Sequence, residues 1–255
     1  MLAVDRHEKI LTLLRQQRSI TLDALAEAVG VSASTVRRDL EQLEPGGQLQ
    51  RTHGGVIYVG ERQSTGRPYA FEHRLSFNLD AKQKIAKAAR DLVSPGQTIL
   101  IDGGTTTFYF ARELTGIPMQ IVTNSLPIGQ LYQNDENVEL ILTGGLAYPR
   151  YGVLLGPMAE QTIKAIHTQT LFMAPAGLHG GRLYNQNQLL VQAEQQMIQQ
   201  SQQVVLLCDS AKFGQQALSK LCDLSDVDVI VTDAAPSESD RQMIETAGCR
   251  LIVAE

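Results

Sequence analysis

Residues 21–43 read TLDALAEAVGVSASTVRRDLEQL, and this stretch decides the fold of the first part of the chain. Four apolar residues with the i, i+3, i+4, i+7 spacing of a helix face are Leu22, Leu25, Ala26 and Val29. Thr21 is a favourable N-cap for this helix, and Gly30 is a favourable residue to end it. A second helix is predicted from the N-cap Ser32 to about residue 43. Two helices joined by a short turn with glycine are typical of a helix-turn-helix.

The flanking residues complete a small domain. Apolar residues at helical spacing predict a further helix over 5–17. After 21–43, the sequence Pro-Gly-Gly at 45–47 ends the second helix. Residues 49–52 and 56–59 then flank a His-Gly-Gly turn and predict a β-hairpin, or wing. We therefore expect a winged helix-turn-helix domain over residues 1–60.

The second helix of this motif is predicted to read DNA. At about 100° per residue, Val36 and Leu40 fall opposite Ser34, so one face packs inward. The outward face and the wing supply hydroxyl, guanidinium and imidazole groups that can contact base edges or phosphates. The candidate DNA-binding residues are Ser32, Ser34, Thr35, Arg37, Arg38, Arg51 and His53. The alternative from spacing alone is a small helical domain with a solvated arginine face.

The sequence changes character after residue 60. Residues 60–68, GERQSTGRP, are polar and contain two glycines and a proline, so a linker is expected over 61–70. Seven short apolar runs then alternate with helical stretches, at 98–101, 120–122, 139–142, 170–173, 204–207, 229–231 and 251–253. This alternation predicts an α/β domain over 71–255 with a mostly parallel sheet covered on both faces.

A glycine- and threonine-rich loop follows the first of these strands. Its residues are Asp102, Gly103, Gly104, Thr105, Thr106 and Thr107, and a helix is predicted to begin there. Free N–H groups, hydroxyls and the positive helix end favour an anion at this position. The loop lacks the lysine of a P-loop and the GxGxxG pattern of a dinucleotide site, so no cofactor is expected. The alternative is a capped turn without a ligand.

Polar groups also follow other strands. Asn124 comes after the second strand, Gly144 after the third and Lys212 after the fifth. Ligands of open α/β sheets bind beyond the carboxyl ends of the strands, so these residues are expected around one crevice. A lone lysine such as Lys212 is more often an ordinary surface residue.

Composition limits the function classes. The 255 residues carry a net charge of −5, and residues 1–60 hold seven basic and seven acidic side chains. DNA contact must therefore come from the placement of charges and not from a basic domain. No run of eighteen apolar residues predicts a membrane span, and the N-terminus does not resemble a signal peptide. Three scattered cysteines predict neither a disulfide framework nor a metal site, so a reduced cytoplasmic setting is expected.

Both parts of the chain resemble the DeoR family of transcriptional regulators. The N-terminal resemblance rests on STVRRDL and RTHGG. The C-terminal resemblance rests on FEHRLSFNLDAKQKIAKAARDLV, DGGTTT, TNS, LTGG, an Ala-Glu pair in a helix and DSAKFG, in the family's order. The resemblance implies a sensor domain related in fold to ribose-5-phosphate isomerase, which binds a phosphorylated sugar or a relative of one.

The resemblance also implies residue roles. The phosphate is expected at 103–107, with Asn124, Gly144, Glu194 and Lys212 around the sugar. Two segments depart from the family pattern: Leu178-His179 with Leu183-Tyr184-Asn185, and Gln195-Gln196. They lie near the expected sugar pocket, so they put the identity of the ligand in doubt.

These observations favour a DNA-binding regulator that represses a sugar-utilisation operon under the control of a phosphorylated effector. We expect a homo-oligomer on double-stranded operator DNA, because one charge-neutral domain offers few phosphate contacts. The alternative is a sugar-phosphate isomerase-like enzyme, which needs a carboxylate base. Residues 174–188, where the isomerases carry an acidic run, contain no Asp or Glu. A third possibility is an interaction module without a ligand.

Overall fold

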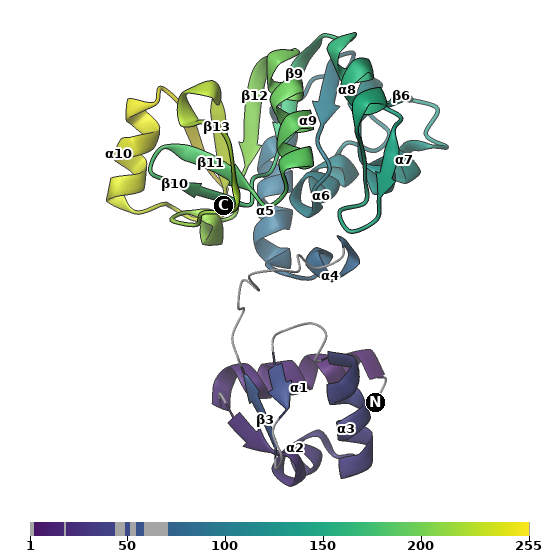
Figure 1. Ribbon diagram of the computed structural model, residues 1–255, viewed down its shortest axis with the longest axis vertical. Helices are drawn as coiled ribbons and strands as arrows, with labels where there is room; N and C mark the ends of the chain where they lie inside the picture. The colour runs from purple at the N-terminus through teal and green to yellow at the C-terminus, as the bar shows by residue number, and fades with distance from the viewer. Residues whose placement is uncertain (1–2, 18, 44–48, 52–54, 59–70, 255) are drawn as a thin grey trace. The chain divides into compact units, whose positions relative to one another are not determined.

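The computed structural model describes residues 3–17, 19–43, 49–51, 55–58 and 71–254. The chain folds as two compact units, Met1–Tyr69 and Ala70–Glu255, called here the N-terminal and C-terminal units (Figure 1). The expected linker at 61–70 lies outside the described residues.

The described residues of the N-terminal unit form three helices and a small sheet. Its elements in chain order are α1 (Ala3–Gln17), β1 (Ser19–Thr21), α2 (Leu22–Val29), α3 (Ala33–Leu43), β2 (Leu49–Arg51) and β3 (Gly55–Tyr58). The expected hairpin β2–β3 gains a third antiparallel strand, in the order β1-β3-β2. A Cβ at Gly55 would lie 2.5 Å from the carbonyl oxygen of Ile20, so glycine allows β1 and β3 to pair closely.

Local capping explains where α2 and α3 begin and end. The hydroxyl of Thr21 accepts a hydrogen bond from the N–H of Ala24, and Gly30 ends α2 with a φ of +77°. The N–H of Thr35 donates to the hydroxyl of Ser32 at 3.3 Å, at the start of α3. The core beneath these helices includes Ile10, Leu25 and Leu40.

A seven-stranded parallel sheet forms the centre of the C-terminal unit. Its strands, in spatial order, are β15 (Arg250–Val253), β14 (Val229–Thr232), β12 (Ser201–Leu207), β9 (Thr168–Met173), β4 (Thr98–Ile101), β5 (Met119–Thr123) and β6 (Val138–Leu142). All seven correspond to the apolar runs of the sequence. The prediction of a mostly parallel α/β domain beside a helix-turn-helix domain is therefore confirmed.

Helices cover both faces of this sheet (Figure 1). They are α4 (Phe71–Leu75), α5 (Leu79–Arg90), α6 (Thr105–Glu113), α7 (Leu126–Tyr132), α8 (Pro157–Lys164), α9 (Gln188–Gln199) and α10 (Glu238–Thr246). Side chains alternate along β4, so that Ile99 and Ile101 pack against α5, α6 and α7 while Leu100 packs on the other face. Two hydrophobic cores result.

Short antiparallel strands add to the second core. One hairpin pairs β7 (Leu146–Tyr148) with β8 (Val153–Leu155). A three-stranded sheet combines β10 (Gly177–His179), β11 (Arg182–Asn185) and β13 (Ser219–Asp223). Two 3-10 turns, η2 (Ser210–Lys212) and η3 (Leu224–Asp226), follow β12 and β13. The sequence did not predict these strands.

The strand order places a topological switch point between β4 and β9. From β4 the chain proceeds through β5 and β6 to one edge, and then returns to β9 on the other side of β4. The loops after β4 and β9 consequently diverge from the sheet in opposite directions, which is where ligands of open α/β sheets bind. The loop that begins at Asp102 lies at this point.

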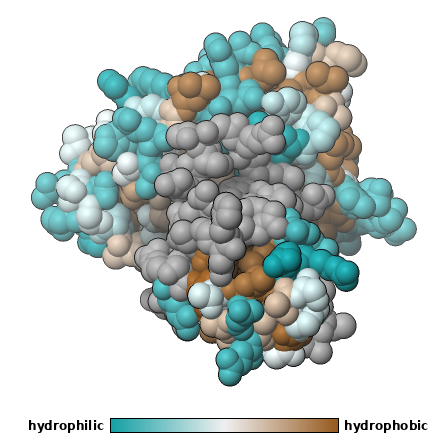
Figure 2. All heavy atoms as spheres, turned by 60° about the horizontal axis from the view of Figure 1, so that its bottom comes forward, coloured by the Kyte–Doolittle hydropathy of each residue, from teal (hydrophilic) through white to brown (hydrophobic). Residues whose placement is uncertain are grey.

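The surface seen in Figure 2 is mixed in character. Hydrophilic residues cover much of its coloured part, and hydrophobic residues gather in smaller areas. The most exposed large apolar side chains among the described residues are Leu146, Met158 and Leu218. No helix among the described residues is long and apolar enough to cross a membrane.

Candidate functional site

Helix α3 presents the polar face that the sequence predicts. Val36 and Leu40 are buried at 0% and 1% exposure, so the apolar side of the helix packs inward. Ser34, Arg37 and Arg38 are exposed, and Thr35 is half-buried. The two guanidinium groups are therefore available to a partner of the N-terminal unit.

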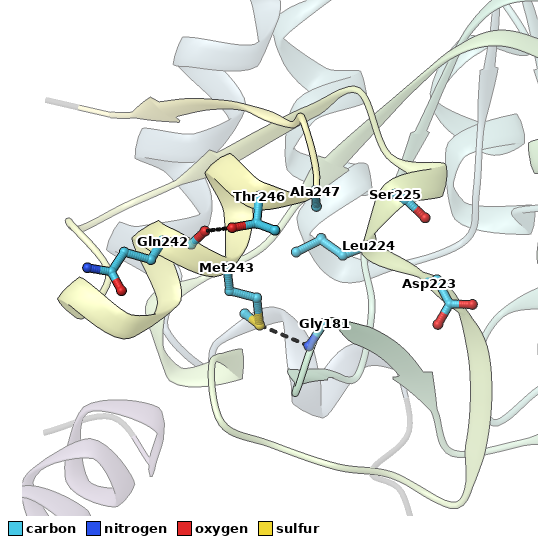
Figure 3. Close-up of a pocket in the computed structure, with 8 residues that line it drawn as sticks. All are labelled: Gly181, Asp223, Leu224, Ser225, Gln242, Met243, Thr246 and Ala247. Carbon is cyan, nitrogen blue, oxygen red and sulfur yellow. Dashed lines mark hydrogen bonds between the residues drawn. The ribbon is translucent and has the colours of Figure 1, made fainter.

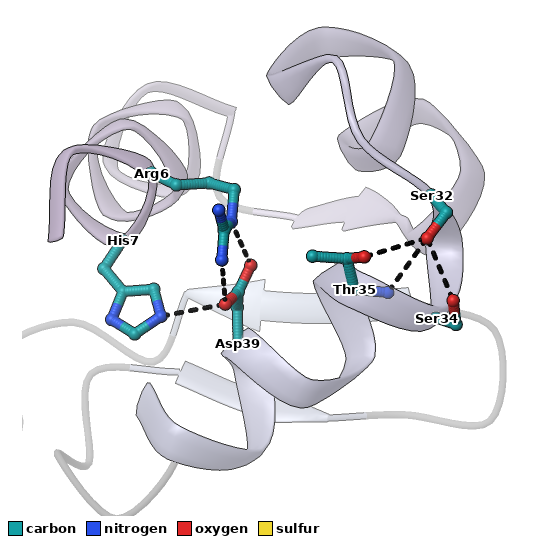
Figure 4. A network of polar contacts seen from close by, with 6 residues as sticks. All are labelled: Arg6, His7, Ser32, Ser34, Thr35 and Asp39. Carbon is teal, nitrogen blue, oxygen red and sulfur yellow. Dashed lines mark hydrogen bonds and ion pairs between the residues drawn. The ribbon is translucent and has the colours of Figure 1, made fainter. Parts of the chain in front are cut away.

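The hydroxyl groups at the start of α3 contact one another (Figure 4). The Ser32 hydroxyl lies 2.9 Å from the hydroxyls of both Ser34 and Thr35. These contacts hold three of the candidate DNA-binding side chains at the N-terminus of the helix. Of the wing candidates, Arg51 belongs to β2, and His53 lies outside the described residues.

Asp39 joins α3 to α1 and was not among the sequence candidates. Its buried carboxylate accepts hydrogen bonds from Arg6 Nε at 2.6 Å and Nη2 at 2.9 Å, and lies 3.0 Å from His7 Nε2 (Figure 4). The Arg6 guanidinium, followed by His7, holds the pKa of Asp39 below its ordinary value. With Ser34 taken as zero, Asp39 falls at about 140° around the helix, beside the apolar face. This position in the sequence pattern could have identified Asp39 as a residue that faces the rest of the N-terminal unit.

In the C-terminal unit, the β4–α6 loop has the features of an anion site. Gly104 is the N-cap of α6, and no side chain caps this helix end. The side chains of Thr105, Thr106 and Thr107 are buried, and the Thr107 hydroxyl donates to the carbonyl of Gly104 at 3.0 Å. The first N–H groups of a helix have no partner within it, so this end can bind an anion.

Gly103 brings this loop against β8. A Cβ at Gly103 would lie 2.1 Å from Cγ1 of Val153. Any larger residue would therefore force the loop away from β8 and displace Asp102, its neighbour.

Buried polar atoms without a hydrogen-bond partner concentrate beside this loop. Six of the seven such side-chain atoms in the described residues belong to four residues, which we call the strand-end cluster. The atoms are Arg74 Nε and Nη2, Asp102 Oδ1, Asn124 Oδ1 and Nδ2, and Glu194 Oε2. Buried polar groups are normally paired, so this concentration indicates a binding site for a polar ligand.

Electrostatic effects show that the members of the cluster are neighbours. Burial raises the pKa of Asp102 to about 6, while contacts with Gly103, Asn124, Arg74 and Glu194 act to lower it. Burial, and then the charge of Asp102, raises the pKa of Glu194 well above its ordinary value. The Arg74 guanidinium carbon lies 5.3 Å from the centre of the Tyr151 ring.

A second set of charged groups lies next to Arg74. Lys82 Nζ donates to the carbonyls of Arg74 and Phe77, both at 2.5 Å. Burial, together with the positive charges of Lys212 and Arg74, lowers the pKa of Lys82 to about 8 although Asp209 opposes the shift. The predicted Lys212 therefore lies close to a second, buried lysine.

The structure thus brings some of the sequence candidates together. Asp102, Asn124 and Glu194 belong to the strand-end cluster, and Lys212 lies near Lys82. Gly144 follows β6, two strands away from β4 in the sheet. Sequence reasoning missed Arg74 and Lys82, although both lie in the stretch FEHRLSFNLDAKQK that resembles the family.

A surface cavity of about 360 Å³ lies away from the strand-end cluster, between α10 and η3 (Figure 3). Its lining includes Leu224 and Met243, and the N–H of Gly181 donates to the Met243 sulfur at 2.9 Å. None of the candidate site residues lines it. Among the described residues, no group of three or more His, Cys, Asp or Glu side chains is placed to hold a metal ion.

Comparisons with known proteins match both parts of the chain. Residues 6–62 match the DeoR-like helix-turn-helix domain, and residues 77–234 match the DeoR C terminal sensor domain. The chain also resembles solved ribose 5-phosphate isomerases. That from Methanocaldococcus jannaschii is 20% identical with a TM-score of 0.40, over 53% of this chain and 55% of that one.

Two curated relatives resemble the chain over nearly its whole length. The uncharacterized HTH-type transcriptional regulator YulB of Bacillus subtilis (strain 168) is 31% identical, over 96% of this chain and 94% of the relative. The HTH-type transcriptional regulator UlaR of Escherichia coli (strain K12 / DH10B) is 30% identical, over 99% of both chains. With its helix-turn-helix and its sensor domain both matched, this chain belongs to the DeoR family of transcriptional regulators.

Proposed function

We propose that this regulator represses a sugar-utilisation operon and that a phosphorylated sugar, or a derivative of one, controls its binding to operator DNA. The observation that carries the proposal is the strand-end cluster, whose six unpaired buried atoms lie beside an uncapped helix end. The DNA-binding part rests on the exposed face of α3. The relatives are named as transcriptional regulators, which favours a regulator over an enzyme.

The chemistry of the cluster favours a polyhydroxylated ligand. Arg74 and Asn124 offer unpaired N–H donors, Asp102 and the Asn124 carbonyl offer unpaired acceptors, and the Glu194 carboxyl group can donate or accept according to its protonation. A sugar hydroxyl both donates and accepts a hydrogen bond, so neighbouring hydroxyls satisfy donors and acceptors together. A purely apolar ligand would leave all six atoms unsatisfied.

The phosphate belongs at the N-terminus of α6. Backbone N–H groups of residues 105–107 and the positive end of the helix dipole favour an anion there. Lys82 and Lys212 add positive charge near Arg74. The ligand then spans the loop after β4, with its phosphate on α6 and its hydroxyls on the strand-end cluster.

Binding at this site is proposed to alter operator affinity by about 1–3 kcal/mol, a five- to 150-fold change. We propose that the regulator acts as a cytoplasmic homo-oligomer, which places two α3 helices on repeated half-sites. From the family resemblance, we expect the ligand to lower operator affinity and so to release the regulator from DNA.

A thermal-shift screen of the full-length protein against phosphorylated sugars, polyols and sugar acids tests the proposal. Each compound that raises the unfolding temperature is then added to the complex with operator DNA, and release is followed by fluorescence anisotropy. Replacing Thr105 and Thr106 by glutamate should remove the ligand response and leave DNA binding intact, because acids repel phosphate. Thr115→Glu, at an exposed position after α6, is the matched control. A screen without any stabilising phosphorylated compound would contradict the proposal.

The carboxyl groups of the strand-end cluster also make the isomerase alternative testable. A buried carboxylate with a raised pKa is the kind of base that aldose–ketose isomerisation requires. We expect no conversion of ribose 5-phosphate by the pure protein. A measurable conversion that disappears on Lys212→Ala would replace the regulatory proposal with an enzymatic one.

A further inference from the structure

Two fully buried carboxyl groups meet inside the proposed effector site. Asp102 and Glu194 are each 2% exposed. Asn185 Nδ2 donates to Glu194 Oε1 at 2.6 Å, while Glu194 Oε2 and Asp102 Oδ1 have no protein donor. The charge of Asp102 raises the pKa of Glu194, which indicates that the two carboxyl groups are neighbours.

Two adjacent buried carboxylates do not both stay ionised, because like charges repel strongly where water is excluded. The surroundings decide which group keeps the proton. Asp102 receives the N–H of Gly103 and the positive charge of Arg74, and both favour its ionised form. Glu194 has the Asn185 amide as its favourable contact and faces the charge of Asp102. The proton therefore belongs on Glu194.

The remaining groups around Glu194 leave this assignment unchanged. Tyr151 and the thiol of Cys222, on β13, both sense the charge of Glu194, and burial raises the pKa of each. Both are thus neutral near pH 7. Arg74 and Asp102 then contribute one positive and one negative charge, and the strand-end cluster is electrically neutral overall.

We propose that Glu194 is a neutral hydrogen-bond donor and Asp102 an ionised acceptor, so that the cluster selects an effector whose non-phosphate end is uncharged. The effector class is a polyol phosphate or sugar phosphate, and a sugar-acid phosphate is disfavoured. This inference rests on the proposed function, because it concerns the same site. A carboxylate at that end would add an unbalanced charge beside Asp102.

Matched ligand pairs test the selectivity. Ribitol 5-phosphate with ribonate 5-phosphate, glucitol 6-phosphate with gluconate 6-phosphate, and galactitol 6-phosphate with galactonate 6-phosphate differ only in a hydroxymethyl against a carboxylate. In any pair that binds the full-length protein, calorimetry should show the polyol about tenfold tighter or more. Tighter binding of the acid overturns the inference but leaves the proposed function standing.

Variants separate the two carboxyl groups in the same calorimetric experiment. Glutamine mimics a protonated glutamate, and asparagine cannot replace an ionised aspartate. Asp102→Asn is therefore expected to weaken binding of the preferred polyol phosphate about tenfold more than Glu194→Gln does. The reverse order would show that the proton lies on Asp102.

A measurement without ligand keeps the inference testable if no compound binds. Glu194 titrates near 4.5 when unfolded and well above this value when folded, so the folded protein loses stability as pH rises above 4.5. Glu194→Gln removes this loss, so its stability relative to the unmodified protein should increase as pH rises above 4.5. Glu113→Gln, an exposed change on α6, is the matched control. A stability difference independent of pH would show that Glu194 is ionised and would overturn the inference.

Discussion

Asp39 shows how a single residue can fix the orientation of helix α3. Its buried carboxylate ties α3 to Arg6 and His7 on α1, thirty-three and thirty-two positions earlier in the chain. Such contacts between distant parts of the chain orient α3 about its own axis. The exposed positions of Arg37 and Arg38 depend on that orientation.

Asp39→Ala should destabilise the N-terminal unit by about 1–3 kcal/mol, because it removes charged hydrogen bonds from a buried position. The pKa of Asp39 is lowered in the folded protein, so the stabilisation is present above its ordinary value of 3.8 and is lost as pH falls below it. Thermal unfolding should be measured from pH 3 to 7. The loss of stability in Asp39→Ala, relative to the unmodified protein, should become smaller at low pH. Glu27→Ala, exposed on α2, is the control. An equal deficit at all pH values would exclude the ion pair as its source.

Arg37 and Arg38 are the residues most directly expected to contact DNA. Replacing either by alanine should cost about 1–3 kcal/mol of operator affinity if it contacts a base, or reduce the salt dependence by about one unit if it contacts phosphate. Anisotropy titrations at several salt concentrations distinguish the two roles. Gln42→Ala, exposed on the same helix, is the matched control. Unchanged affinity in both arginine variants would remove this face as the DNA interface.

Some residues of the proposed effector site could be predicted from the sequence alone, and others could not. Asp102 and Asn124 follow strands directly, and the rule for parallel sheets places them at one edge. Glu194 came only from family resemblance, although its spacing from Leu190 and Met197 places it on the apolar face of its helix. Arg74 precedes every strand of the sheet, so its position beside Asp102 depends on tertiary packing that local pattern does not contain.

At the scale of elements, periodic patterns found the strands of the main sheet and missed the irregular additions. Continuous apolar runs bounded by turn residues identify strands that are buried on both faces. The strands β7, β8, β10 and β11 are only three or four residues long. Such segments carry too few residues for alternation to be recognised.

Helix α4 is the element best placed to connect effector and DNA binding. It is the first described element after residues 59–70, and it carries Arg74 of the strand-end cluster. Its Phe71 ring packs edge-to-face against Phe108 of α6, with centroids 5.7 Å apart. A ligand that binds both α6 and Arg74 therefore acts on the start of the C-terminal unit.

Phe71→Ala should loosen α4 from α6 without removing an atom of the strand-end cluster. We expect effector affinity to change less than about threefold, while the effect of the ligand on operator affinity falls to about a third of its original value or less. Calorimetry gives the first quantity, and anisotropy with and without ligand gives the second. Met158→Ala, an exposed apolar change on α8, controls for general effects. If the ligand changed the operator affinity of Phe71→Ala as much as that of the unmodified protein, α4 would be excluded as the link between the effector site and DNA binding.

At the scale of the whole molecule, the distribution of charge argues for more than one copy on DNA. Residues 1–60 carry equal numbers of basic and acidic side chains, and Arg6 is already paired with Asp39. Few cations remain for phosphate, and each phosphate contact contributes about −0.9 to the slope of log affinity against log salt. A single copy should therefore bind weakly, whereas two linked copies gain from effective concentration.

The full-length protein should consequently be at least a dimer at concentrations that bind operator DNA. Light scattering gives its mass, and anisotropy compares an operator selected from random DNA with the same operator cut to one half-site. Loss of one half-site should weaken binding by about 10²-fold, since the second contact is then no longer intramolecular. It should also reduce the salt slope towards half, because half of the phosphate contacts disappear. A monomer whose affinity and salt slope are the same on both DNAs would show that one α3 helix suffices, and the argument from charge would then be wrong.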